Sequence, residues 1–264
     1  MSDVRQFTHR PSGPLRRYVR EILWITSDDA RLQPLLPETI LTMVLRQSGS
    51  ASLHNETLPD TLVSGLQQQT RMVAHSPGSS LVIVRFTEVG APAFLHQPAD
   101  QLYNRTSPLE AILPLHEIER IQNTLADARE IPQQVIEIER FLTARIRTHH
   151  GISPQIEAAV EMIRNSHGRS TITAIARYVA MSQSALERHF RGAVGTSPKK
   201  LSRLARLHHV CRLWHAGKSL TEIAFTAGYS DQPHLVRDFQ LFTGTSPEKF
   251  FRTSAPQNLP TFYK

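Results

Sequence analysis

The sequence predicts two domains: an α+β domain built on a small β-barrel or sandwich with added helices, followed by an all-α domain. Three observations lead to this division. Short apolar segments separated by turn residues lie between residues 20 and 90, one helical pattern occurs twice after residue 170, and basic charge is concentrated in the second half. The segment GISP at 151–154 interrupts the helical pattern. In a chain of 264 residues, we therefore expect domains at residues 1–151 and 152–264.

Six short apolar segments in the first half have the length and the flanking residues of β-strands. Gly, Pro, Ser and Asn separate them, as is typical of strands joined by turns. The expected strands are residues 21–26, 39–46, 51–54, 61–64, 71–75 and 80–86. A short helix is expected before them at 15–19, and longer helical patterns follow at 91–95, 109–113, 115–126 and 132–149.

Two features of this half allow more than one interpretation. The helix at 132–149 carries an apolar stripe of Val135, Ile138, Leu142 and His149. This stripe predicts either the seam of a homodimer or a face packed on the barrel, and three heptads are too few to decide. Four aromatic residues could line a ligand pocket, although core packing is the favoured interpretation; they are Trp24, Phe86, Phe94 and Tyr103.

The second half contains one helical pattern twice. Leu186, Arg188, Phe190 and GTSP at 195–198 return forty-nine positions later as Leu235, Arg237, Phe239 and GTSP at 244–247. An Ile-Ala pair precedes each copy. On a wheel of about 3.6 residues per turn, the apolar members of each copy share one face. The expected structural core comprises Ile175, Ala176, Leu186, Phe190, Ile223, Ala224, Leu235 and Phe239.

Local signals define the ends of these helices. Ser182 precedes the second helix of the first copy and is expected to cap it. Ser219 and Glu222 have the S-x-x-E spacing of a capping box at the start of the second copy. Between the copies, Ser197 and Pro198 begin a joining helix that runs to about residue 215, and Gly217 ends it. At ~1.5 Å per residue, this helix spans roughly 27 Å, close to the ~34 Å of one DNA turn.

Charge separates the two halves in the same way. From residue 153 onward the chain has fifteen Lys and Arg against seven Asp and Glu, a net charge of +8. The first 152 residues have fifteen against sixteen, a net charge of −1. Basic charge on a helical domain favours binding to phosphates, which supplies much of the nonspecific affinity for DNA.

The C-terminal pattern resembles the DNA-binding domain of the AraC/XylS family of bacterial transcription regulators. The resemblance rests on the paired motifs, Leu213 on the joining helix, GYS at 228–230, and the closing GTSP at 244–247 with Phe250, and it covers residues 153–252. It implies an all-α domain of two helix-turn-helix motifs and binding to double-stranded promoter DNA. By family habit it also implies an activator that contacts RNA polymerase.

The first half is similar, more weakly, to an uncharacterised sensor domain found on one branch of these regulators. The matching segments are LPE at 36–38, VSG at 63–65 and VRF at 84–86 leading to Gly90. This resemblance implies a cupin-like barrel followed by helices, which binds a small-molecule effector. The branch usually has Pro-Gly where this chain has Val89-Gly90, and the comparison names no ligand.

The family motif implies roles for individual residues. Side chains expected to face base edges are Ser184, Glu187, Arg188, Gln232, His234 and Arg237. Arg binds guanine through two hydrogen bonds, Gln can read adenine, and Glu can accept from cytosine. Side chains expected to contact phosphates are Arg191, Lys199, Lys200 and Arg203. Phosphate contacts would fix the register without reading the sequence.

Other function classes have little support in the sequence. The scattered His residues lack metal-ligand spacing, and no cofactor motif is found, so we expect neither a metal nor a cofactor. SPKK at 197–200 matches S-x-x-K, but its position at a helix cap favours a structural role. Cys211 is the single cysteine and suits the buried face of the joining helix. We therefore do not expect an enzyme.

The chain also has no apolar run long enough for a membrane helix and no signal peptide at its start, which predicts a cytoplasmic protein of the bacterial nucleoid. Two other functions stay open. One is an architectural DNA-binding protein whose first domain only dimerises, and the other is an enzyme tethered to DNA by its helical half.

Overall fold

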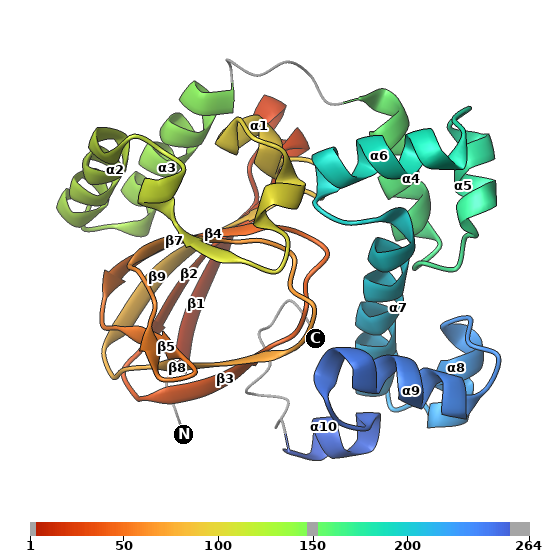
Figure 1. The fold of residues 1–264 in the computed structure, drawn as a ribbon. Helices are drawn as coiled ribbons and strands as arrows, with labels where there is room; N and C mark the ends of the chain where they lie inside the picture. The colour runs from red at the N-terminus through yellow and green to blue at the C-terminus, as the bar shows by residue number, and fades with distance from the viewer. Residues whose placement is uncertain (1–3, 147–152, 254–264) are drawn as a thin grey trace.

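The computed structural model describes residues 4–146 and 153–253. The expected domain boundary at 151/152 and His149 lie outside these residues. The described parts form a β-rich domain with helices on one side, followed by a helical domain (Figure 1). This arrangement confirms the predicted fold class.

Two antiparallel sheets face each other in the first domain. The larger sheet has the order β1 (Val4–His9), β2 (Val19–Ser27), β9 (Ser79–Phe86), β4 (Thr42–Ser48), β7 (Thr61–Ser64) and β10 (Thr106–Pro108). The smaller has the order β3 (Arg31–Leu35), β8 (Arg71–His75), β5 (Ala51–Leu53) and β6 (Glu56–Thr57).

All six predicted strands are present, and β1, β3, β6 and β10 were not predicted. The reason is local, because β1 is an exposed edge strand and β6 and β10 are only two and three residues long. None of these three carries the alternating apolar pattern that identifies a half-buried strand. β3 contains Pro34, a residue that is disfavoured within strands.

Helices cover the outer face of the larger sheet. They are η1 (Gly13–Arg17), α1 (Ala91–Leu95), η2 (Ala99–Leu102), η3 (Leu109–Ala111), α2 (Leu115–Asp127) and α3 (Ile131–Ile146). Alternate residues of the central strands point to these helices, because successive side chains of a strand face opposite sides. Trp24 Nε1 donates to Gln134 Oε1 of α3 at 2.7 Å, and the rings of Phe86 and Phe94 lie 5.4 Å apart. These aromatic residues are therefore core, as the favoured interpretation held.

The apolar stripe of α3 packs within the chain. Ile138 and Leu142 are fully buried, and Val135 packs against the same core. Of the two interpretations of this stripe, the structure shows packing on the barrel domain.

The helical domain contains α4 (Pro154–Asn165), α5 (Ile172–Tyr178), α6 (Gln183–Val194), α7 (Pro198–His215), α8 (Leu220–Thr226), α9 (Gln232–Thr243) and α10 (Pro247–Thr253). The pairs α5–α6 and α8–α9 are the two predicted motifs, and α7 joins them as an eighteen-residue rod (Figure 1).

The predicted caps are present. Ser182 and Ser197 each accept a hydrogen bond from the backbone three residues later, and Ser219 and Glu222 form the capping box. Gly195 and Gly244 end α6 and α9 with φ of +88° and +74°, a conformation that favours glycine. These short-range interactions explain why the helix bounds could be predicted from sequence.

Candidate DNA interface and barrel cavity

Each helix-turn-helix copy is held together by the residues that were expected to form its core. In the first copy α5 and α6 pack through the buried face that carries the Ile-Ala pair, and α8 and α9 do so in the second. The eight buried residues are Ile175, Ala176, Leu186, Phe190, Ile223, Ala224, Leu235 and Phe239. Burial of this face leaves the opposite face of α6 and of α9 for other contacts.

The outer face of α6 is polar and exposed. Ser184 and Arg188 are exposed, and the Arg188 guanidinium lies 3.5 Å from Nε2 of His189. Glu187 is half-buried and forms an i,i+4 ion pair with Arg191 at 3.4 Å. This pair is mostly solvent-exposed, so it adds little stability and leaves both side chains able to take another partner.

The outer face of α9 carries fewer charges. Arg237 is exposed, whereas Gln232 and His234 are half-buried. Gln232 Oε1 accepts a hydrogen bond from Thr221 of α8 at 3.1 Å, and Ser230 Oγ lies 3.1 Å from Nδ1 of His234. The Gln-Thr contact has a counterpart in the first copy.

There, Gln183 Nε2 donates to Thr173 Oγ1 at 2.9 Å. Each motif therefore orients the first turn of its second helix by a hydrogen bond to its first helix. This contact positions the exposed face that follows it.

The four residues expected to contact phosphates fall into two groups. Arg191 and Lys199 are exposed. Lys200 is half-buried, donates to the hydroxyl of Tyr103 in the first domain, and lies 4.7 Å from the centre of that ring. Burial, followed by the charge of Arg203, lowers the pKa of Lys200. The Arg203 guanidinium donates to Asp238 Oδ1 at 2.6 Å.

Asp238 is the centre of a buried polar network between α7 and α9. Besides Arg203, it accepts a hydrogen bond from the Tyr229 hydroxyl at 3.0 Å. The guanidinium of Arg206 lies 5.1 Å from the centre of the Tyr229 ring. Sequence reasoning missed this network. A carboxylate next to Phe239, on the apolar face of α9, was the signal that could have revealed it, since a buried carboxylate needs a partner.

Besides the contact between Lys200 and Tyr103, further polar contacts join the two domains. Arg17 forms a bidentate ion pair with Glu157 of α4, with both N–O distances at 2.7 Å. The carbonyl of Pro37 lies 2.7 Å from Nε2 of His208 on α7. The backbone N–H of Thr70 donates to the carbonyl of Phe242 on α9 at 2.7 Å. The first domain thus contacts both the joining helix and the second recognition helix.

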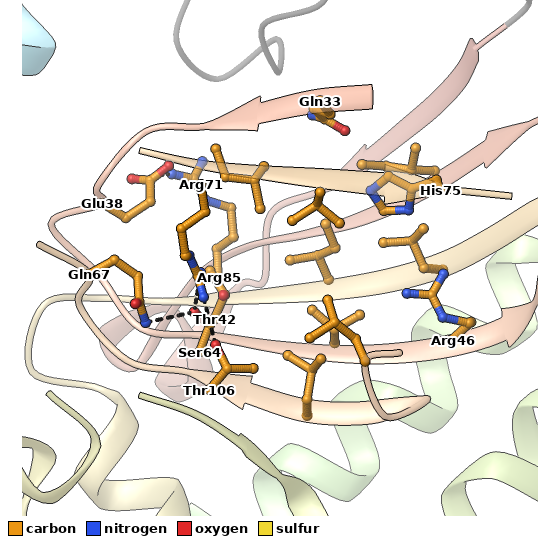
Figure 2. Close-up of a pocket in the computed structure, with 18 of the residues that line it drawn as sticks. Gln33, Glu38, Thr42, Arg46, Ser64, Gln67, Arg71, His75, Arg85 and Thr106 are labelled. Atoms are coloured by element: carbon orange, nitrogen blue, oxygen red, sulfur yellow. Dashed lines mark hydrogen bonds and ion pairs between the residues drawn. The ribbon is translucent and has the colours of Figure 1, made fainter. Parts of the chain in front are cut away.

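The barrel encloses a cavity of about 140 Å³ between its two sheets. Along each strand, residues that point into the cavity alternate with residues that point away from it. Inward residues at paired positions of neighbouring strands therefore form layers across the cavity. Figure 2 shows Arg46 and His75 at one end and Glu38, Arg71 and Arg85 at the other, with aliphatic side chains between them.

The end with Arg85 is rich in internal contacts. Arg85 forms ion pairs with Glu21 and with Glu38, the latter at 3.3 Å. Arg71 donates to Thr106 Oγ1 at 2.7 Å and to Ser64 Oγ at 2.9 Å. Gly65, beside Ser64, has no room for a side chain, because a Cβ would lie 1.9 Å from the carbonyl oxygen of Leu102.

The sequence predicts no metal site, no membrane helix and no reactive cysteine. Within 4–146 and 153–253, no group of three or more His, Cys, Asp or Glu side chains is placed to hold a metal ion. In the same part of the chain, none of the helices combines the length and apolarity needed to span a membrane. Cys211 is buried on α7, and burial raises the pKa of its thiol to about 12, which makes it a poor nucleophile.

Two family models match the chain. A model described as a helix-turn-helix domain matches residues 175–253, and a model described as a domain of unknown function, DUF6597, matches residues 7–108. A comparison with curated proteins found no match.

Among solved structures, the chain is similar to the C-terminal domain of AraT, a response regulator from Geobacillus stearothermophilus. The identity is 25%, with a TM-score of 0.37, over 39% of this chain and 88% of that one. A probable AraC family transcriptional regulator from Rhodopseudomonas palustris gives 24% identity and a TM-score of 0.35, over 39% of this chain and 100% of that one.

ToxT from Vibrio cholerae matches over 94% of this chain and 97% of its own, at 11% identity and a TM-score of 0.47. The C-terminal domain is therefore assigned as a helix-turn-helix domain from the family model and not from these structural superpositions. The chain carries a helix-turn-helix domain at residues 175–253 behind a domain of unknown function at residues 7–108.

Proposed function

We propose that the protein is an AraC-type transcription regulator that inserts α6 and α9 into successive major-groove segments of promoter DNA, under control of its N-terminal domain. The observation that carries the proposal is the pair of polar, exposed helix faces held at the two ends of α7 (Figure 1). The eighteen residues of α7 span roughly 27 Å. This length suits two recognition helices about one DNA turn apart, ~34 Å.

Base recognition is assigned to the exposed faces. Arg188 and Arg237 would each bind a guanine through O6 and N7, and each such pair is worth about 1–3 kcal/mol of discrimination. Gln232 would read adenine and Glu187 cytosine. Ser184 and His234 complete the proposed base contacts. Pro233, next to Gln232, has no N–H to offer and adds no base contact.

Phosphate contacts are assigned to exposed Arg191 and Lys199 first. Lys200 and Arg203 would have to exchange their partners, Tyr103 and Asp238, for a phosphate. Because Tyr103 belongs to the N-terminal domain, DNA and that domain would compete for Lys200. Domain contact and DNA binding are thereby coupled.

A sensor role for the N-terminal domain is supported by how its cavity meets the DNA-binding domain. Leu36 and Glu38 line the cavity, and Pro37 between them contacts His208 of α7. Arg71 also lines the cavity, and Thr70 before it bonds to the end of α9. A ligand that moves either segment would change the placement of the two recognition helices.

We assign the protein as an activator that contacts RNA polymerase on the promoter. The competing proposal is an architectural DNA-binding protein whose N-terminal domain only dimerises. A cavity lined by buried charged side chains favours the sensor, because a purely dimerising barrel has no need to bury them.

The test is DNase protection of the DNA upstream of its own and neighbouring genes, at physiological salt. We expect a discrete footprint of about two major-groove turns with the wild-type protein. The Arg188→Ala, Arg237→Ala double variant should lose it. A double variant with the same charge change on α2 and α3, Arg120→Ala with Arg140→Ala, is the matched control and should retain it.

Uniform protection that fades with salt equally for all three proteins would contradict the proposal. Such protection would establish nonspecific binding and favour the architectural protein. Transcription in vitro with purified RNA polymerase from the footprinted promoter then separates activation from repression.

A further inference from the structure

The strand registers place the residues that line the cavity in three layers. Val44 of β4 pairs with Ile83 of β9, and Gln33 of β3 pairs with Val73 of β8. These residues form a mainly aliphatic middle layer. One layer beyond it, Arg46 pairs with Leu81 and Arg31 pairs with His75. Arg46 of the larger sheet therefore lies at the same end of the barrel as Arg31 and His75 of the smaller sheet.

Arg46 is a deeply buried cation whose ion-pair partner, Asp60, is itself exposed to solvent. Its side chain is 3% exposed, and neither Nε nor Nη1 has a hydrogen-bond partner among the described residues. The nearest carboxylate is that of Asp60, 3.6 Å from Nε and 67% exposed. A buried guanidinium that lacks hydrogen bonds is costly, so the fold retains this one at the expense of stability.

The groups around Arg46 add to the positive potential. In the described part of the chain, no carboxylate forms an ion pair with Arg31. Nδ1 of His75 likewise has no hydrogen-bond partner there. Burial, followed by the charges of Arg46 and Arg31, lowers the pKa of His75 to about 4. His75 is therefore neutral at pH 7 and able to donate one N–H.

At the opposite end of the cavity, the arginine side chains already have partners within the protein. Arg85 there is already neutralised by Glu21 and Glu38, and Arg71 donates to two hydroxyl groups. A ligand that enters the cavity with an anionic group therefore meets its strongest attraction at Arg46. Its remaining atoms would lie along the aliphatic middle layer of Val44, Val73 and Ile83.

We propose that the barrel cavity binds a small organic carboxylate, with the carboxylate held by Arg46, Arg31 and His75 and the apolar body against the middle layer. Arg binds a carboxylate through two parallel hydrogen bonds, and a carboxylate at the terminal edge of the guanidinium would bond the buried Nη1 together with Nη2. A cavity of about 140 Å³ suits a body the size of one six-membered ring, since ~150 Å³ holds benzene. This inference rests on the proposed sensor function and specifies its effector class.

The test is calorimetric titration of the purified full-length protein with cyclohexanecarboxylate, its neutral isostere cyclohexanecarboxamide, and sulfate. We expect the carboxylate to bind and to raise the Tm, and the amide and sulfate to bind at least roughly tenfold more weakly. Arg46→Met should abolish the preference for the carboxylate. Arg129→Met, an exposed arginine outside the cavity, is the matched control and should retain it.

Arg46→Met removes a buried charge, so we expect it to fold with an unchanged or higher Tm. If it fails to fold, Arg46→Lys serves in its place and should weaken carboxylate binding through loss of the bidentate contact. Equal binding of the carboxylate and the amide would overturn the proposal, as would no binding of the carboxylate. Because the DNA footprint is measured without ligand, either failure leaves the test of the proposed function intact.

Discussion

The two helix-turn-helix copies share a sequence pattern but are anchored differently. In the first copy, α4 packs on α5 and α6, and α6 lies against η2 of the N-terminal domain. In the second, Asp238 ties α9 to α7 through Arg203 and Tyr229. The position forty-nine residues before Asp238 is His189, which is exposed. The repeated motif thus gives the two copies the same helix arrangement, whereas the contacts that attach each copy to the rest of the protein differ.

The closing GTSP segments show the same contrast. Gly195 and Lys200 of the first copy lie against Ala99 and Tyr103 of the N-terminal domain. Their counterparts, Gly244 and Lys249, are exposed. A change in the N-terminal domain would therefore reach the first copy through side chains. It would reach the second mainly through the backbone contact between Thr70 and Phe242.

The largest effect is expected from Asp238→Ala. Loss of this carboxylate leaves Arg203 and the Tyr229 hydroxyl without their shared partner, and we expect a loss of roughly 3 kcal/mol in the free energy of unfolding. Hydrogen exchange should show the loss of protection in α8 and α9 before α5 and α6. His189→Ala, at the equivalent exposed position, should change stability by less than about 0.5 kcal/mol. Equal effects of the two variants would remove the proposed difference in anchoring.

A smaller effect is expected from the closing glycines. Gly195→Ala and Gly244→Ala each place a side chain at positive φ, at a cost of roughly 1 kcal/mol. A Cβ at Gly195 would also lie 3.0 Å from the carbonyl oxygen of Ala99, whereas one at Gly244 would contact nothing within 4 Å. Thermal unfolding should therefore show the larger loss for Gly195→Ala. A larger loss for Gly244→Ala would indicate that the first copy is not held against η2.

The smallest effect concerns pH. The rings of His167 and His209 stack 4.1 Å apart between α4 and α7. Burial and nearby Arg212 lower the pKa of both, and the pKa of His209 falls to about 4. Unfolded histidines bind protons near pH 6.5, whereas folded His209 does so only near pH 4. Stability is therefore full above about pH 6.5 and decreases as pH falls below it.

Hydrogen exchange between about pH 7 and about pH 5 should show reduced protection in the first copy and an unchanged second copy. His209→Gln should weaken this dependence. An identical loss in both copies would mean that other titrating groups control the acid sensitivity.

Sequence reasoning located the helices of the helix-turn-helix domain more accurately than the roles of their side chains. The helix bounds follow from caps such as Ser182 and Ser219, which act within three residues. The family motif implied that Arg203 contacts phosphate, whereas in this structure it binds Asp238, thirty-five residues away. Its phosphate role stays a prediction that DNA complexes must test.

The barrel shows the opposite balance. The strands around the cavity were mostly predicted, but the charged residues inside it were not singled out. Arg46, Arg71 and Arg85 occupy alternate strand positions that usually face solvent when charged, and nothing local distinguishes an inward from an outward arginine. The aromatic residues considered as pocket candidates, such as Trp24 and Phe86, pack under the helices, in agreement with the favoured core interpretation.

The sequence by itself determined the two-domain organisation, the repeated helix-turn-helix motifs and their caps, because each depends on periodicity or on contacts within one helical turn. The tertiary structure decided the partners of Asp238 and Lys200, the packing of α3 on the barrel, and the cationic end of the cavity. These depend on residues distant in sequence, such as Tyr103 ninety-seven positions before Lys200. Only the folded chain brings such groups together and removes them from water, which gives their charges large energetic effects.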